Sequence, residues 1–402
     1  MRILLISRAF PYPPHDGEAA SIDRYLRRLA PRHRITLATV APADDRRRLE
    51  GERVLGGLGL RLAAVPERRL ARPLRALECL RDGRPWVNRF YEPELARLVA
   101  AELSGGDHDA VLAWGIMSAQ HLPRRPGPGP IPPAALMAVD CLSLAHRRRY
   151  EATGSPRELI QAIKIRAMER AMGRACRVVL AASPVDAAAL RAILPATLVE
   201  VLPIGVEAEA FRPDPAREEP GTVLMSGAMD FPPNEEAALW LAREIWPLVR
   251  RRATGARLVL AGRSPTAAVA ALAEAAGGLP GVTVTGPVAS MADQVARAAV
   301  VVSPLLQGTG LKTKVMEAAF MAKALVATPV SLEGLPLEPG RDCLVASEAG
   351  AFAGAVARLL EDEPERRRLG GNARAAIEQG FAIAPLAARL EAILEGIIKP
   401  GL

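Results

Sequence analysis

Short apolar segments alternate with helical patterns along the whole chain, and this alternation limits the possible folds more than any other feature. The strand-like runs of the first half lie at 2–7, 34–41, 109–115, 134–140 and 177–183. They are nearly continuously apolar and rich in β-branched residues, which is typical of parallel strands buried on both faces. Helical spacing of apolar residues separates them, most clearly at 20–32 and 156–175. The pattern predicts an α/β fold with doubly wound parallel sheets.

A second alternating series follows residue 221. Its expected strands lie at 222–228, 257–262, 282–286, 300–305, 324–329 and 343–346, with helices at about 234–252, 265–276, 290–298 and 312–322. The segment 203–221 is rich in Pro, Glu and Gly and lacks hydrophobic periodicity. This composition is typical of a linker between domains. A chain of 402 residues is also too long for one typical domain. We expect an N-terminal domain over 1–205, a C-terminal domain over 206–384, and a last helical segment over 385–402 that returns to the first domain.

Composition argues against several classes of protein. The chain has no apolar run near the length of a membrane span, and the apolar core of the opening MRILLIS is too short for a signal peptide. We therefore expect a cytoplasmic protein. The four cysteines form no C-x-x-C pair and the five histidines are scattered. This predicts free thiols and no metal site.

The charge is unevenly distributed. Residues 1–205 contain 32 Lys and Arg against 21 Asp and Glu, whereas 206–402 contain 20 against 23. A basic first half could face nucleic acid, anionic lipid or an anionic substrate. Aromatic residues are only 4% and do not interleave with the basic runs, so we expect no nucleic-acid partner. The basic segments 70–77 and 146–151 are typical of solvated surfaces. Together with the charge excess, they also suit contact with an anionic membrane, at the inner face of the plasma membrane.

The stretch QGTGLKTKVMEAA is the best candidate for a binding site. Gly308 and Gly310 follow an expected strand and precede an expected helix, where backbone N–H groups and the positive helix end suit phosphate oxygens. Lys312 and Lys314, two of only five lysines, lie in the first helical turn, where cations oppose the helix dipole. Glu317 lies one turn further along. An anionic ligand would explain cations at this place.

The longer segment GLKTKVMEAAFMAKALVATPVSLEGL resembles the donor-site signature of retaining GT-B glycosyltransferases of the family 4 type (group 1). Other marks of that family occur in order: VLPIGVEAEAFRP, VLMSGAMDFPPNEEAALWLAREIWPLV, LVLAGRSP and VTVTGPV. The opening MRILLISRAFPYPPHDGEA resembles its first strand and Gly-bearing loop. PYPPHDG and SGAMDFPPN look closest to bacterial sugar transferases associated with exopolysaccharide and exosortase systems. The resemblance implies the GT-B fold, with two Rossmann-like domains whose parallel sheets face across a cleft.

The resemblance further implies a nucleoside-diphosphate sugar as donor, held mainly by the C-terminal domain. Glu317 matches the glutamate that binds the ribose hydroxyls of the donor, a role that suits two carboxylate oxygens. The backbone of Thr309, Gly310 and Leu311 would hold the diphosphate with help from the two lysines.

Further donor-side candidates come from other loops. Pro287 and Val288 match the part of the fold that meets the base. Gly17 would let a loop of the first domain approach the phosphates or the sugar. The other donor-side candidates are Gly227, Asn234 and Arg263.

Two features depart from the family pattern. Many members carry a second glutamate eight positions before the ribose-binding one, and Thr309 stands there. They also carry an Arg and a Lys after the first strand of the C-terminal domain, and here Asn234 lies near the lysine position. The leaving diphosphate must be neutralised when the glycosyl–phosphate bond breaks. We expect Lys312 and Lys314 to do this as catalytic residues, with help from Arg263.

Three candidates in the first half lie in or next to loops. His15 and Asp16, in YPPHDG, are expected to contact the acceptor. Asp140 ends an expected strand and could be catalytic or could cap a helix. The Asp-x-Asp of GDHDA at 106–110 precedes a strand instead of following one, which favours a turn over a metal site.

These observations predict a metal-independent hexosyltransferase with no cofactor. It would transfer a hexose from a nucleoside-diphosphate sugar to a hydroxyl of a glycan, lipid-linked or small-molecule acceptor, with retention as the norm of the class. Two alternatives stay open. One is a nucleotide-sugar epimerase of the same fold, and the other is a catalytically degenerate subunit that only binds a nucleotide sugar.

Overall fold

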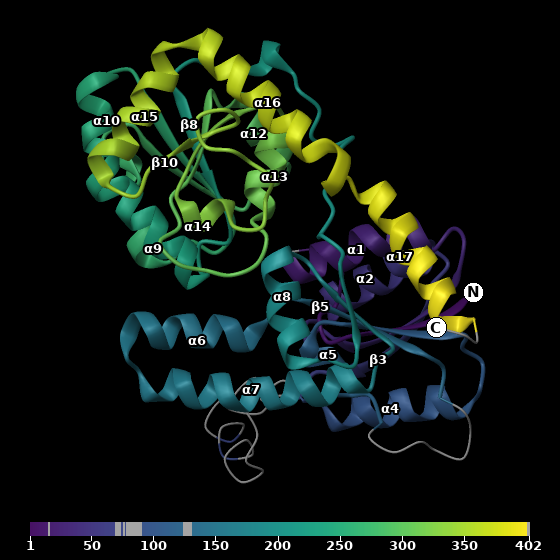
Figure 1. Ribbon diagram of the computed structural model, residues 1–402. Helices are drawn as coiled ribbons and strands as arrows, with labels where there is room; N and C mark the ends of the chain where they lie inside the picture. Colours follow the sequence, from purple (N-terminus) through teal and green to yellow (C-terminus); the bar gives the residue numbers. More distant parts are fainter. Residues whose placement is uncertain (15–16, 69–73, 75–76, 78–90, 124–130, 400–402) are drawn as a thin grey trace. The chain divides into compact units, whose positions relative to one another are not determined.

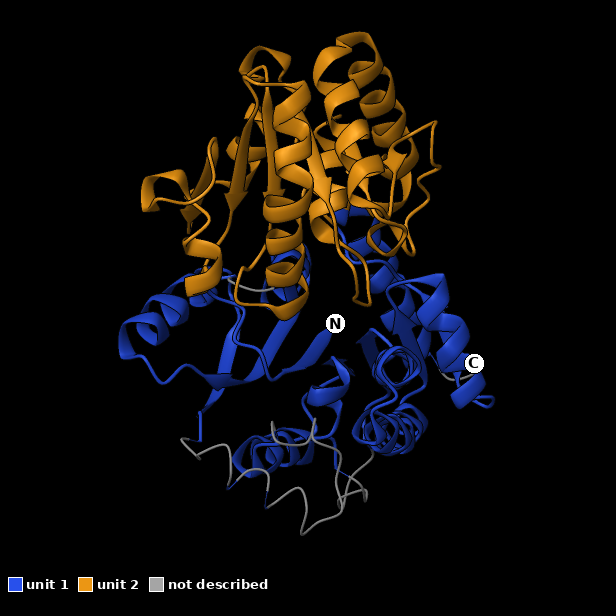
Figure 2. Ribbon diagram, turned by 90° about the vertical axis from the view of Figure 1, so that its left-hand side faces the viewer, with its two compact units in different colours: residues 1–205, 383–402 blue, residues 206–382 orange. Residues whose placement is uncertain are grey.

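The computed structural model describes residues 1–14, 17–68, 74, 77, 91–123 and 131–399. The chain forms two compact units, Met1–Gly205 with Ile383–Leu402, and Val206–Ala382 (Figure 2). Each unit is built around a parallel sheet. None of the helices in the described part of the chain has the length and apolar character that crossing a membrane requires.

The first unit contains a sheet in the order β3-β2-β1-β4-β5-β6-β7. Its strands are β1 (Arg2–Ser7), β2 (Arg34–Ala41), β3 (Arg61–Pro66), β4 (Ala110–Trp114), β5 (Ala134–Val139), β6 (Val178–Ala181) and β7 (Leu198–Val201). Its helices with described bounds are α1 (Gly17–Leu29), α2 (Asp45–Gly57), α4 (Pro93–Ser104), α5 (Ile116–Ala119), α6 (Leu142–Thr153), α7 (Pro156–Arg174), α8 (Pro184–Ile193) and α17 (Ile383–Ile398).

Both faces of this sheet are buried. In β1, Leu4 and Ile6 belong to one apolar cluster, whereas Ile3 and Leu5 belong to another on the opposite face. Helix α17 contributes to the second cluster and packs against α1 (Figure 1). Burial on both faces explains why the strands read as continuous apolar runs in the sequence.

The second unit contains a parallel sheet in the order β10-β9-β8-β11-β12-β13. Its strands are β8 (Thr222–Ser226), β9 (Arg257–Ala261), β10 (Val282–Gly286), β11 (Val300–Ser303), β12 (Ala324–Ala327) and β13 (Leu344–Val345). Its α-helices are α9 (Pro232–Trp240), α10 (Trp246–Arg252), α11 (Ala267–Ala270), α12 (Met291–Arg297), α13 (Thr313–Phe320), α14 (Pro329–Leu332), α15 (Ala349–Glu361) and α16 (Glu363–Phe381). The expected fold class of two doubly wound parallel sheets is confirmed.

Some expected elements differ in the structure. The single helix expected over 265–276 is the short α11 followed by a 3-10 turn, Glu274–Ala276. After this turn the chain folds back against α11 and the residues that follow it. The approach is so close that a Cβ on Gly278 would lie 2.5 Å from the Leu272 carbonyl oxygen. The helix expected over 234–252 is α9 and α10 joined by a π-helical turn, Leu241–Ile245.

A buried ionic cluster fixes the segment that enters the second sheet. Glu218 accepts hydrogen bonds from Lys323 Nζ at 3.1 Å and from Arg366 Nη2 at 3.0 Å. Both cations are buried, and burial lowers the pKa of Lys323. Arg366 also donates to the Leu359 carbonyl oxygen at 2.8 Å. The cluster joins three segments that are distant in sequence.

Glu218→Ala should lower the free energy of unfolding by about 2–3 kcal/mol, because it leaves two buried cations without their carboxylate. Urea unfolding, followed by the fluorescence of Trp240 and Trp246 in the second unit, would measure the change. The matched control is Glu378→Ala, which removes an exposed pair with Arg374 and should cost less than about 1 kcal/mol. Equal effects of the two substitutions would contradict the role of the buried cluster.

Candidate functional site

The strand order of the second sheet reverses beside β8. From β8 the chain proceeds outward to β9 and β10, and then returns to place β11 on the other side of β8. At such a reversal the following connections diverge and leave room for a ligand at the carboxyl ends of the strands. The loop after β8 and the turn after β11 border this point from its two sides.

The turn after β11 is held in a conformation that requires glycine. Gly308 has φ +140° and Gly310 has φ +72°. Lys312 is buried, and its Nζ donates to the Gly310 carbonyl oxygen at 2.5 Å. Helix α13 begins directly after it, so the unpaired N–H groups of its first turn lie beside the glycines. Lys312 therefore stabilises the turn itself.

A buried network of hydroxyl groups anchors the start of this turn. Ser303 ends β11, and its Oγ lies 3.0 Å from Ser331 Oγ. Ser331 donates to the Ser303 carbonyl oxygen at 2.6 Å, and Thr328 Oγ1 donates to the Leu305 carbonyl oxygen at 2.6 Å. The residues after β12 thus fix the backbone from which the glycine turn departs. Sequence reasoning did not identify them.

Lys314 and Asn234 are in direct contact, and Gly227 lies next to them. Lys314 Nζ donates to Asn234 Oδ1 at 2.6 Å, and Asn234 Nδ2 donates to the Ala228 carbonyl oxygen at 3.0 Å. Gly227 has φ +154°, and a Cβ at this position would lie 3.2 Å from Lys314 Nζ and 2.8 Å from Asn234 Nδ2. A side chain at position 227 would therefore crowd the Lys314 ammonium group. Glycine leaves room for it at the point where the strand order reverses.

The ammonium group of Lys314 is easily deprotonated for a lysine. Its pKa falls to about 8, first because of burial and second because of the positive charge of Lys312, while Glu317 acts in the opposite direction. An ammonium has three N–H donors, and Asn234 is its one hydrogen-bond partner within the described residues. Lys314 thus carries a positive charge that an anion would stabilise.

Three other predicted residues are Thr309, Leu311 and Glu317. Thr309 lies half-buried between the two glycines, and Leu311, which follows them in the chain, is buried. Glu317 lies half-buried on α13, close enough to Lys314 to raise its pKa. These residues belong to the same turn and helix as the lysines.

Arg263 approaches the site from β9. Its Nη1 lies 3.4 Å from Asp230 Oδ2, in the loop after β8. Gly262 precedes it with φ +150°, and a Cβ there would lie 1.8 Å from the Gly227 carbonyl oxygen. The sequence interpretation overlooked Gly262. The available signal was the glycine that ends or follows three successive strands, Gly227, Gly262 and Gly286.

Pro287 and Val288 directly follow β10, two strands away from β8. Pro287 is exposed and Val288 is half-buried. They lie at the same edge of the sheet as the lysine site but do not form part of its hydrogen-bonded contact.

Two candidates in the first unit, Gly17 and Asp140, follow strands β1 and β5 at the carboxyl edge of its own sheet. Gly17 begins α1, and a Cβ there would have open space, so the backbone does not require glycine. Asp140 directly follows β5 and is half-buried. His15 and Asp16 lie outside the described residues. The turn at 106–110 precedes β4, and its Asp109 forms an ion pair with Arg2.

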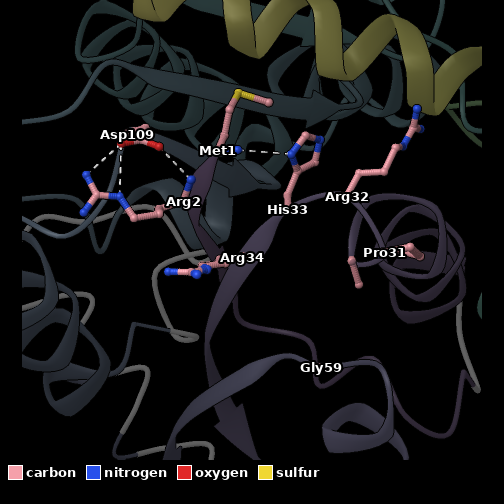
Figure 3. Close-up of a pocket in the computed structure, with 9 residues that line it drawn as sticks. Met1, Arg2, Pro31, Arg32, His33, Arg34, Gly59 and Asp109 are labelled. Carbon is pink, nitrogen blue, oxygen red and sulfur yellow. Dashed lines mark hydrogen bonds and ion pairs between the residues drawn. The ribbon is translucent and has the colours of Figure 1, made fainter.

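A hollow of the first unit lies at the opposite, amino-terminal edge of its sheet (Figure 3). Arg2 Nη2 lies 2.9 Å from Asp109 Oδ1, and Arg32 and His33 contact Glu391 of α17 at 3.0 and 2.9 Å. These pairs join the amino ends of the strands to each other and to the last helix. We interpret the hollow as a structural junction.

Among the described residues, no group of three or more His, Cys, Asp or Glu side chains is placed to hold a metal ion. Cys141, Cys176 and Cys343 are buried free thiols, and burial raises the pKa of each.

Comparison with known proteins bears on the second unit directly. Residues 220–362 match the family model described as Glycosyl transferases group 1. This part of the chain is therefore similar to the glycosyltransferase group 1 family. It includes the Lys314–Asn234 contact and the glycine turn. A search of curated protein sequences found no significant match.

Solved structures with the same fold span nearly the whole chain. A sucrose-phosphate synthase from Thermosynechococcus elongatus has a TM-score of 0.74 at 17% identity, covering 99% of each chain. HepE of Anabaena, solved with UDP and glucose, has a TM-score of 0.70 at 16% identity, covering 98% of this chain and 99% of that one. A variant of S. aureus TarM, solved with fondaparinux, alpha-GlcNAc-glycerol and UDP, has a TM-score of 0.70 at 10% identity, covering 98% and 99%. These likenesses support the GT-B fold class.

Lys314 should titrate near pH 8. Because the chain has only five lysines, lysine-specific isotope labelling and NMR can follow each one, and Lys314→Arg would identify the resonance. Lys312→Met should raise the pKa of Lys314, since it removes a neighbouring positive charge. An ordinary pKa near 10.4 for Lys314 would contradict the lowering that burial and Lys312 are expected to cause.

Proposed function

We propose that this protein is a glycosyltransferase that binds a nucleoside-diphosphate sugar at the carboxyl edge of its second sheet and transfers the sugar to a hydroxyl group. The observation that carries the proposal is the Lys314 ammonium group, held by Asn234 where β8 and β11 separate, beside a glycine turn and a helix N-terminus. This site lies inside the segment that matches the glycosyltransferase family. HepE, which has a similar fold, has been solved with UDP-glucose.

The reaction requires charge stabilisation at one place above all. The bond between the sugar C1 and the diphosphate oxygen breaks, a bond between C1 and the acceptor oxygen forms, and the hydroxyl proton passes to a phosphate oxygen. The leaving diphosphate gains negative charge as its bond to C1 breaks. Fixed donors in a site shielded from water stabilise that charge most effectively. Retention of configuration, the norm of the resembled class, is part of the proposal.

Lys314 would supply that stabilisation. Asn234 Oδ1 accepts a hydrogen bond from one of the three N–H groups of the Lys314 ammonium. The other two N–H groups can reach phosphate oxygens. The N–H groups of the first turn of α13 and the positive end of its dipole would bind the same phosphates. Lys312 already donates to Gly310, so its role is to hold the turn and add long-range positive charge. This neutralisation needs no metal ion or other cofactor.

The rest of the donor would extend along the edge of the sheet. Glu317, one turn into α13, would accept the ribose hydroxyls. Pro287 and Val288 lie two strands from β8, about 10 Å away at ordinary strand spacing, which is a suitable separation between a base and its diphosphate. Arg263, between them, would contact the phosphates or the sugar.

The first unit would supply the acceptor side, with Gly17, His15, Asp16 and Asp140 as its candidate residues. A glycan, a lipid-linked sugar or a small molecule would serve as acceptor, in the cytoplasm. A hexose as the transferred group follows the resembled family. Thr309 would leave the site without the second glutamate of that family.

Wild-type protein should release nucleoside diphosphate from at least one member of a panel of nucleotide sugars, with transfer or slow hydrolysis as the readout. Lys314→Ala should lower that rate about 100-fold or more with the fold intact, since it removes a donor to the leaving group. Lys399→Ala, at an exposed position, is the matched control and should leave the rate unchanged.

An exchange variant sharpens the test. The contact between the two side chains means that a lysine at 234 can reach the same space, so Asn234→Lys combined with Lys314→Asn should recover much of the lost rate. Donor binding without turnover by any donor would favour the degenerate subunit, and interconversion of free nucleotide sugars would favour the epimerase. Unchanged turnover in Lys314→Ala would remove the proposed role of that lysine.

A further inference from the structure

Helices α6 and α7 form an antiparallel hairpin in the first unit (Figure 1). Helix α6 ends at Gly154, which has φ +66°, and α7 begins two residues later. One side of α7 is buried in the core of the unit through Ile165, Met168 and Met172. Its opposite side is exposed to solvent over the whole helix.

The exposed side of α7 begins with large aliphatic residues. Leu159, Ile160 and Ile163 are 36%, 51% and 62% exposed. Residues three and four positions apart lie on the same side of a helix, so these three side chains form a continuous patch. A clustered apolar patch on a soluble protein indicates contact with another surface.

The remainder of the same side is basic. Arg166, Arg170 and Arg174 follow Ile163 at intervals of three and four residues and are all exposed. None of the ion pairs found among the described residues involves these three arginines. The α7 face is defined here as Leu159, Ile160, Ile163, Arg166, Arg170 and Arg174.

The hairpin offers little negative charge to oppose these arginines. Its two helices contain eight Lys and Arg against three Asp and Glu. Of the three acids, Glu169 is buried, while Glu151 and Glu158 pair with Arg147 and Arg149 of α6. The α7 face therefore combines an apolar patch with a net positive charge.

We propose that the α7 face docks the protein on an anionic lipid surface. Its aliphatic side chains enter the boundary between headgroups and acyl chains, and its guanidinium groups bind lipid phosphates. This moves the membrane contact suggested by the sequence from segment 146–151, on α6, to the neighbouring helix. Segment 70–77 lies mostly outside the described residues.

Charge argues against a second copy of the chain as the occupant. A two-fold contact would bring the same three arginines of each copy close together, and like charges at an interface oppose association. Three aliphatic side chains are also far from the roughly 1,600 Å² that a stable interface buries. A bilayer with anionic headgroups satisfies both the apolar and the basic part of the face.

The test is co-sedimentation of the full chain with vesicles of phosphatidylcholine alone and of phosphatidylcholine mixed with phosphatidylglycerol. Binding should be strong only to the mixed vesicles and should weaken as salt screens the arginines. The double variant Ile160→Ser with Ile163→Ser should bind the mixed vesicles about tenfold more weakly. Arg166→Glu with Arg170→Glu should lose the preference for anionic lipid.

The matched control is Leu198→Ser, because Leu198 is 54% exposed on the edge strand β7. It should bind like the wild type. In Ile163→Trp, mixed vesicles should shift the added tryptophan emission to shorter wavelength. Absence of vesicle binding, or equal loss in the control, would overturn the proposal. So would a dimer in solution that the isoleucine variant dissociates. The experiment uses neither donor nor acceptor, so its outcome is independent of the proposed function.

Discussion

The reversal of strand order between β8 and β11 is the constraint on which the proposed donor site depends. Parallel strands buried on both faces need crossover helices, and a sheet that grows outward from its first strand in both directions must change direction once. In the second unit that change separates the loop after β8 from the turn after β11. One side-chain contact links the loop and the turn. Lys314 and Asn234, 80 residues apart in the chain, join the two sides through one hydrogen bond of 2.6 Å.

The cost of this arrangement is electrostatic. Two lysines at the start of α13 oppose the helix dipole and each other. The pKa of Lys314 falls to about 8, first because of burial and second because of the charge of Lys312. Structures keep such unfavourable charges where a ligand compensates for them. Gly227 and Gly262 allow the loops after β8 and β9 to approach each other closely, and hydroxyl groups on β11 and after β12 fix the turn. A diphosphate is the ligand that the proposed function assigns to the lysines and the helix terminus.

Much of the fold could be predicted from the sequence, and the limits have physical causes. Continuous apolar runs identified the buried central strands, whereas β3, at the edge and only half-buried, lies in a stretch that had no clear pattern. The glycine turn could be predicted from the sequence, because two glycines between an expected strand and an expected helix, followed by two lysines, form a local pattern. The different positions of the two lysines could not be predicted, because Lys312 folds back onto Gly310 and Lys314 reaches an asparagine that is distant in sequence. Likewise, helical spacing over 156–175 predicted α7, but its exposed side depends on how it packs in the unit.

The central claim is that a nucleoside diphosphate binds at the carboxyl edge of the second sheet. Hydrogen–deuterium exchange of the full chain, with and without UDP, GDP or ADP, tests it most directly. At least one of these should slow exchange in the turn and first helical turn at 304–317, in the loop at 227–234 and after β10 at 286–288. Exchange at the hollow around Arg2 and His33 should not change. Protection that appears elsewhere and spares the glycine turn, or no protection with any of the three, would contradict the account.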